Sequence, residues 1–203
     1  MTALFFGAAA FALMALADWL GALRHMRGAA LLFPLGCAAL AGATVWLAAH
    51  RLRAAGLPDG ARAIVCLGLA ACALALLMHT LFFALPVAGS GALPPTSGKQ
   101  PLAHTGVYAL CRHPGVLWLG AFYLALWGAL GGAPLGWAFA LFTGLDTAYV
   151  LWQDKKVFPH TIENYAAYQR DTPFLIPHAR SVRACAATWG RRAKTCPGKK
   201  KGS

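Results

Sequence analysis

The chain has 203 residues, of which 59% are apolar and only 12% are charged, and it carries 18 Lys and Arg against 6 Asp and Glu. A soluble globular domain holds about 25% charged residues, so the composition excludes an ordinary soluble domain and favours an integral membrane protein. The net charge of +12 is also typical of nucleic-acid-binding proteins. The long apolar runs favour a membrane partner instead, and we expect no nucleic-acid partner.

Three apolar runs in the first half are long enough to cross a bilayer: residues 3–23, 29–50 and 63–85. No Lys or Arg precedes the first run, whereas Arg24 and Arg27 follow it. The first run is therefore predicted to be a retained span and not a secretory signal peptide. Asp18 lies near its end, where the side chain either belongs to a functional site or reaches the headgroups or Arg24.

Residues 86–104 contain prolines, glycines and serines that break every helical periodicity, and we expect this long loop to lie over a functional site. Two more apolar runs follow, at 115–131 and 135–152, and an uncharged turn at 131–134 joins them. The whole pattern predicts an all-α polytopic membrane protein with about five transmembrane helices, of which the last two form a helical hairpin.

The distribution of Lys and Arg predicts the orientation, because cytosolic loops are enriched in these residues. The uncharged turn at 131–134 is assigned to the outside, which places the C-terminus in the cytosol of a protein of the bacterial inner membrane. The loop at 51–62 then falls outside although it contains Arg51, Arg53 and Arg62. It is the one segment that disagrees with the rule.

The C-terminal part is polar. A short amphipathic segment follows the fifth span and is expected in the cytosol. Residues 1–177 are interpreted as a single membrane domain, in which residues 100–177 form the half that holds the cofactor site. Residues 178–203 are basic and contain no acid. We expect them to form a disordered tail that meets anionic lipid headgroups.

The six cysteines include no Cys-x-x-Cys pair, and three of them lie inside apolar runs. They are interpreted as small buried hydrophobic residues. We therefore expect neither a metal site nor a disulfide framework.

The polar corner Arg112-His113-Pro114 stands directly before the fourth span. Pro is favoured at the first position of a helix, which places His113 at or beside the N-cap. The free N–H groups and the positive dipole end of a helix attract negative groups. The corner is therefore expected to hold an anionic or zwitterionic ligand.

A second polar group follows the fifth span, where Asp146, Tyr149 and Gln153 share one helix face and Asp154 is adjacent. The hairpin brings this end of the span next to the corner. A pocket is predicted from six side chains: Arg112, His113, Gln153, Asp154, Tyr165 and Tyr168. The alternative is a belt of interfacial aromatic and charged residues without a pocket.

The ordered motifs are Gly106-Val-Tyr108, Arg112-His113-Pro114, Gln153-Asp154, Tyr165-x-x-Tyr168 and Thr172-Pro173-x-x-Ile176-Pro177. This set, within residues 100–178, resembles the isoprenylcysteine carboxyl methyltransferase-like membrane family, which extends to phospholipid methyltransferases. The resemblance implies methyl transfer from S-adenosylmethionine to a lipophilic acceptor. It implies catalytic roles for His113 and Arg112, and cofactor binding by Tyr108, His113, Pro114, Gln153, Asp154, Tyr165 and Tyr168.

The sequence departs from the family pattern at three points. Val116 stands where Tyr is usual, Gln153-Asp154 replaces a Glu-Glu pair, and no Gly precedes Tyr165.

Two other classes of function stay open. NADPH-dependent membrane reductases share the Arg-His-Pro corner, although their pattern continues with Asn-Tyr. A non-enzymatic assembly factor or transporter-like protein is the other alternative.

Overall fold

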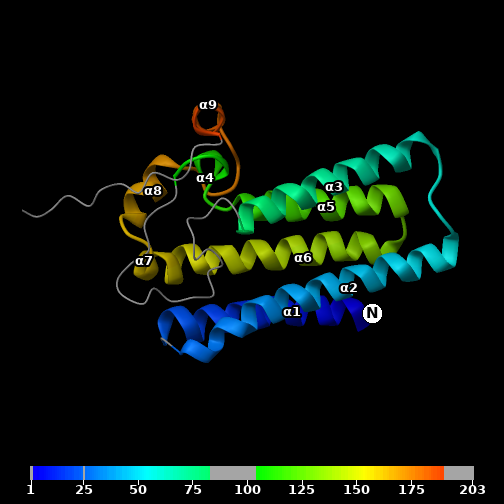
Figure 1. The fold of residues 1–203 in the computed structure, drawn as a ribbon, viewed down its shortest axis with the longest axis horizontal. Helices are drawn as coiled ribbons and strands as arrows, with labels where there is room; N and C mark the ends of the chain where they lie inside the picture. Colours follow the sequence, from blue (N-terminus) through cyan, green and yellow to red (C-terminus); the bar gives the residue numbers. More distant parts are fainter. Residues whose placement is uncertain (1, 25, 83–103, 190–203) are drawn as a thin grey trace, which may run out of the picture.

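The computed structural model describes residues 2–24, 26–82 and 104–189, and every regular element in these ranges is a helix. The predicted all-α fold is thereby confirmed. Five long helices run side by side (Figure 1): α1 (Thr2–Asp18), α2 (Leu32–Ala55), α3 (Gly60–Phe82), α5 (Pro114–Leu130) and α6 (Ala133–Trp152). The α1–α2 pair and the α3–α5 pair lie on either side of α6.

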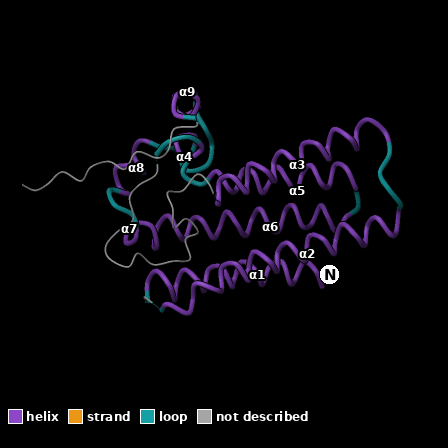
Figure 2. The backbone as a smooth tube through the Cα atoms, viewed as in Figure 1, coloured by secondary structure: helices purple, strands orange, loops and turns teal. Residues whose placement is uncertain are grey.

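The shorter elements are η1 (Trp19–Leu23), η2 (Arg27–Leu31), α4 (Val107–Leu110), η3 (Gln153–Val157), α7 (Phe158–Thr161), α8 (Tyr165–Asp171) and α9 (Ala179–Thr188). The helices α4, α7, α8 and α9 gather at one end of the long helices (Figure 1). The opposite end carries the α2–α3 loop and the α5–α6 turn, and the loops of the described chain lie at these two ends (Figure 2). The small helices thus make the two ends of the bundle unequal.

Four helical segments are long and apolar enough to cross a membrane: Thr2–Ala22, Leu32–Ala55, Gly60–Phe82 and Ala133–Thr161. The remaining predicted span corresponds to α5, which is apolar and has 17 residues, about the shortest length that spans a bilayer. Large apolar side chains such as Phe5, Ile64 and Trp137 point away from the packed interior. Such a surface is stable in lipid and not in water, so the chain is a polytopic membrane protein.

The packed interior lies between α1, α2, α5 and α6, and α3 contributes Leu77 to it. Tyr123 and Phe142 are fully buried at its centre with their ring centroids 5.3 Å apart, and the hydroxyls of Tyr123 and Thr44 are hydrogen-bonded at 2.5 Å. Glycines allow the close approach of the helices: a Cβ on Gly7 would overlap the Phe142 ring, and one on Gly36 would lie 2.9 Å from the backbone oxygen of Ala10. Small residues at helix contacts are the usual means of packing in membranes.

The predicted hairpin of the last two spans is also present. Gly131 and Gly132 connect α5 to α6 with φ angles of 67° and 87°. These values fall in the left-handed region, where a residue without a Cβ is strongly favoured. The two glycines therefore reverse the chain within two residues, which brings the end of α6 back to the start of α5.

Two predictions about connecting segments had different outcomes. The prediction of a disordered tail is wrong for residues 179–188, which form α9 and pack against α4. A capping box explains the helix start, because the His178 ring accepts from the Ser181 N–H at 3.0 Å and the Ser181 hydroxyl accepts from the His178 N–H at 3.1 Å. Residues 190–203, and nearly all of the loop predicted to cover the site, lie outside the described residues.

Substitution of Gly36 by Ala should destabilise the bundle, because the new methyl group would meet the backbone of α1. We expect a loss of about 1–3 kcal/mol from overpacking, which outweighs the gain of up to about 1 kcal/mol in helix propensity. The measurement is reversible unfolding in detergent. Gly42→Ala on the same helix is the matched control, because no atom lies within 4 Å of its added Cβ. Equal effects of both substitutions would contradict the proposed close contact.

Candidate functional site

The corner before α5 has the predicted local structure. His113 is the N-cap residue and Pro114 is the first residue of the helix. The backbone N–H groups of Arg112 and His113 donate to the carbonyl oxygens of Pro173 and Phe174, at 2.9 and 3.3 Å. These two hydrogen bonds hold the segment after α8 against the corner. They join residues that lie about sixty positions apart in the sequence.

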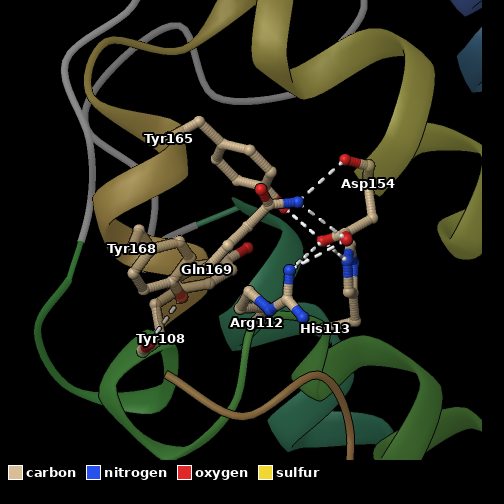
Figure 3. A network of polar contacts seen from close by, with 7 residues as sticks. All are labelled: Tyr108, Arg112, His113, Asp154, Tyr165, Tyr168 and Gln169. Atoms are coloured by element: carbon tan, nitrogen blue, oxygen red, sulfur yellow. Dashed lines mark hydrogen bonds and ion pairs between the residues drawn. The ribbon is translucent and has the colours of Figure 1, made fainter. Parts of the chain in front are cut away.

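The carboxylate of Asp154 lies at the centre of the candidate site (Figure 3). Arg112 Nη1 donates to both carboxylate oxygens at 2.8 Å, and His113 Nε2 lies 3.1 Å from Oδ1. From α8, the Tyr165 hydroxyl donates to Oδ1 at 2.5 Å and Gln169 Nε2 donates to Oδ2 at 3.0 Å. Four side chains from two other segments of the chain therefore converge on one acid, and we call these five residues the Asp154 cluster.

The charges of the Asp154 cluster are largely withdrawn from solvent. The side chains of Arg112 and Asp154 are only 12% and 9% exposed. A buried ion pair is favourable only when its geometry is good and its remaining donors and acceptors are satisfied. The bonds from His113, Tyr165 and Gln169 supply the further donors that the carboxylate needs.

Aromatic rings enclose the histidine of the Asp154 cluster. The His113 ring stacks on Phe158 of α7 at 5.7 Å and meets the edge of Phe174 at 5.0 Å. The Arg112 guanidinium also lies 5.4 Å from the centre of the Phe174 ring, a distance typical of cation–π attraction. Neither phenylalanine was predicted from the sequence, because each lies outside the helix faces that carried the polar residues.

Burial lowers the pKa of His113, and the hydrogen bond to Asp154 only partly opposes this effect. The imidazole is therefore neutral at pH 7. A neutral ring that bonds to a carboxylate through Nε2 must carry its proton there, which leaves Nδ1 as the acceptor nitrogen. The hydrogen bond to Asp154 thus determines which nitrogen of His113 carries the proton, as is usual for histidines in structured sites.

The two tyrosines of α8 are both buried. Tyr165 bonds to Asp154, whereas the Tyr168 hydroxyl donates to the carbonyl oxygen of Tyr108 at 2.6 Å. Burial raises the pKa of both phenols, so both hydroxyls stay protonated and act as donors. Gln169 lies one turn after Tyr165, and this i, i+4 spacing is the pattern that could have identified it from the sequence.

Tyr108 occupies a different position from the one expected of a residue in the pocket wall. Its hydroxyl donates to the carbonyl oxygen of Thr80 in α3 at 3.3 Å, so the ring is anchored towards the bundle. Figure 3 shows it beyond Tyr168 and away from the Asp154 carboxylate. The structure therefore makes Tyr108 a support of α8, and its binding role stays a prediction.

The structure does not bring Gln153 into the Asp154 cluster. Its Nε2 donates to the Asp18 carboxylate of α1 at 2.6 Å, and the Tyr149 hydroxyl donates to the same oxygen. Asp18 is only 3% exposed, so of the two alternatives for its side chain, contact with headgroups or with Arg24 is wrong. Adjacent helical residues point about 100° apart, which is why Gln153 and Asp154 serve two separate polar clusters.

One buried donor at the site has no partner among the described residues. Arg112 Nε is inaccessible to solvent and makes no hydrogen bond, although Nη1 of the same guanidinium makes two. A buried donor that stays unbonded costs about 1–3 kcal/mol. The Nε–H of Arg112 is thus a buried donor of the Asp154 cluster without an acceptor among the described residues.

Comparisons with family models, with curated proteins and with solved structures each give no match. The fold and the site themselves define a class: a polytopic membrane protein whose Arg, His, Asp and Tyr residues converge at one end of its helices.

Replacement of Asp154 by Asn should destabilise the protein by about 3 kcal/mol, because it leaves the buried Arg112 charge without a counter-charge. The amide keeps the shape of the carboxylate, so the loss reports charge and not packing. Thermal unfolding in detergent measures it. Asp171→Asn at the exposed end of α8 removes one charge of the same sign and should have no effect.

The stability of the protein should fall as the pH drops through about 6.5, the ordinary pKa of a histidine. The folded-state pKa of His113 is below this value, so the unfolded chain binds the proton first and is favoured by acid. His113→Gln keeps a donor for Asp154 but does not titrate. The difference between the two unfolding-versus-pH curves isolates the imidazole, and identical curves would contradict a buried neutral His113.

Proposed function

We propose that the chain is an integral-membrane methyltransferase that moves a methyl group from S-adenosylmethionine to a lipophilic acceptor. The supporting observation is the convergence on Asp154 of the segments that carry the family-like motifs. These are the corner at Arg112 and His113, the end of α6, and α8 with Tyr165. In the sequence they are separate motifs, and the Asp154 carboxylate joins them.

The residues at the site fit the chemical groups of S-adenosylmethionine. The unbonded, buried Nε–H of Arg112 suits the carboxylate of the amino-acid portion, because a guanidinium binds carboxylates strongly. The rings of Phe158, Phe174 and Tyr165 suit a sulfonium cation, which aromatic faces attract. Bound S-adenosylmethionine supplies an electrophilic methyl group on that sulfonium.

In this proposal the main role of Asp154 is to hold neighbouring side chains in position. Its carboxylate oxygens already accept from Arg112, His113, Tyr165 and Gln169, and these bonds hold the guanidinium and the imidazole in fixed orientations. Methyl transfer depends chiefly on alignment of the reacting atoms. By preventing rotation of Arg112 and His113, Asp154 would therefore contribute directly to the rate of methyl transfer.

His113 is the residue available for proton removal. Its Nε2–H points at Asp154, and the Nδ1 lone pair is the free acceptor of the neutral ring. An acceptor with an amine, thiol or hydroxyl group would give its proton to Nδ1 while the carboxylate of Asp154 stabilises the resulting imidazolium. A carboxylate acceptor would need no base.

The location of the Asp154 cluster suits a lipophilic acceptor. The cluster lies at the end of apolar helices whose outer surfaces face lipid, so an acceptor dissolved in the bilayer can reach it without entering water. We propose that this end faces the cytosol of a bacterial inner membrane, where S-adenosylmethionine is present. The basic residues after α9 would then meet the anionic headgroups of the same leaflet.

Calorimetry on the full-length protein in detergent should show saturable binding of S-adenosylmethionine. Arg112→Lys keeps the charge but removes Nε, and we expect about tenfold weaker binding from the loss of one charge-assisted hydrogen bond. Arg170→Lys, on the exposed face of α8, is the matched control and should bind normally. Transfer of radiolabelled methyl to a total membrane lipid extract, lost in Asp154→Ala, tests the reaction itself, because Asp154 positions Arg112 and His113 whichever acceptor is used. Binding of NADPH instead, or of neither compound, would contradict the proposal.

A further inference from the structure

Three arginines flank the loop between α2 and α3, which lies at the end of the bundle opposite the Asp154 cluster (Figure 1): Arg51 and Arg53 near the end of α2, and Arg62 at the start of α3. Arg51, Arg53 and Arg62 face a single acid, Asp59. Lys and Arg are enriched in cytosolic loops. This loop is assigned to the outside, so that rule does not explain its excess of arginine. A specific negative partner on that side would explain it.

A cavity of about 200 Å³ opens at this loop. Its lining is Arg51, Ala55, Gly56, Leu57, Pro58, Asp59, Arg62, Ala129 and Leu130. We call it the Arg51 pocket. Its two guanidinium groups against one carboxylate leave it positively charged, and its volume is below the roughly 300 Å³ of the smallest pockets for drug-sized ligands. The Arg51 pocket therefore suits a small anionic group.

Arg51 is held in place but is not satisfied. Its side chain lies over the α5–α6 turn, where a Cβ on Gly132 would come within 3.1 Å of Arg51 Cδ and Nε. The Nε atom is buried and has no hydrogen-bond partner in the part of the chain that the structure describes. Within the described ranges, neither Arg51 nor Arg62 forms an ion pair with a carboxylate. A positioned guanidinium with an unused donor is the arrangement that binds a phosphate.

Exposed tryptophans near the Arg51 pocket indicate that it lies at the headgroup level of a membrane. Trp46 precedes Arg51 on α2, and Trp127 and Trp137 flank the α5–α6 turn; the three are 48%, 40% and 63% exposed. Tryptophans concentrate at the level of the lipid headgroups. Leu57, which lines the pocket, is 86% exposed as well, so an apolar residue stands beside the charged ones at the membrane surface.

We infer that the Arg51 pocket binds the phosphate of an anionic phospholipid in the leaflet opposite the Asp154 cluster. The phosphate accepts hydrogen bonds from the guanidinium groups of Arg51 and Arg62, which line the pocket, while the acyl chains stay among the lipid-facing side chains. Inorganic phosphate presents the same chemistry to the two arginines. The pocket lies at headgroup level, where a phosphate and an apolar tail are available together. This position favours a phospholipid over inorganic phosphate.

Native mass spectrometry of the full-length protein in detergent, titrated with phosphatidylglycerol or phosphatidylcholine of the same acyl chains, tests this inference. Wild type should bind phosphatidylglycerol in preference. Arg51→Gln and Arg62→Gln should each weaken the tightest phosphatidylglycerol site about tenfold, the effect of one lost charge-assisted hydrogen bond. Arg53→Gln removes the same charge from an exposed position outside the pocket lining and should leave that site unchanged.

The controls separate the alternatives. Every variant keeps the basic C-terminal residues, so lipids bound there contribute equally to all titrations. If Arg51→Gln fails to fold by circular dichroism, Arg62→Gln still tests the pocket. An equal loss in Arg53→Gln would show unspecific charge attraction and overturn the inference. Equal binding of both lipids, or displacement of phosphatidylglycerol by inorganic phosphate at matched concentration, would overturn it as well.

Discussion

The ion pair between Arg112 and Asp154 is the interaction on which the rest of this end of the protein depends. Both side chains are withdrawn from water, where a single unpaired charge would be strongly destabilising. The pair therefore requires that the corner before α5 and the end of α6 stay together. Through Tyr165 and Gln169 it also requires α8 to lie across that junction. One carboxylate thus determines the relative position of three helices, α5, α6 and α8.

The long helices supply the rigidity that such a site needs. The two-residue turn at Gly131 and Gly132 fixes α5 against α6, and the glycines at positions 7 and 36 let α1 pack closely on α6 and α2. Beyond Trp152 the chain continues as the π-helical turn η3 without a break. Its first two residues face in different directions, so Gln153 secures α1 through Asp18 while Asp154 secures the corner. The two polar clusters together tie the N-terminal and C-terminal helices to α6.

Much of the fold could be predicted because hydropathy and span length follow from the bilayer itself. The helix start at His113 and Pro114 and the hairpin turn could be predicted because both are local features. The partners of Gln153 and Asp154 could not be separated, because the face on which each residue lies depends on where α1 packs. Phe174 was missed for a related reason: its ring reaches His113 only after residues 173 and 174 have bonded to the corner. The helix α9 was missed because its capping residues, His178 and Ser181, lie in a segment whose basic composition is typical of disorder.

The separation of these residues along the chain bears on how the protein is made. Arg112 precedes Asp154 by 42 residues, and the segment that closes the corner, at Pro173 and Phe174, is synthesised later still. The corner is synthesised before any of these partners, so the Arg112 charge has no counter-charge until Asp154 follows it. Asp154, Tyr165 and Gln169 all precede Pro173, so a chain that ends before Pro173 holds every member of the Asp154 cluster but lacks the two carbonyl groups that accept from the corner.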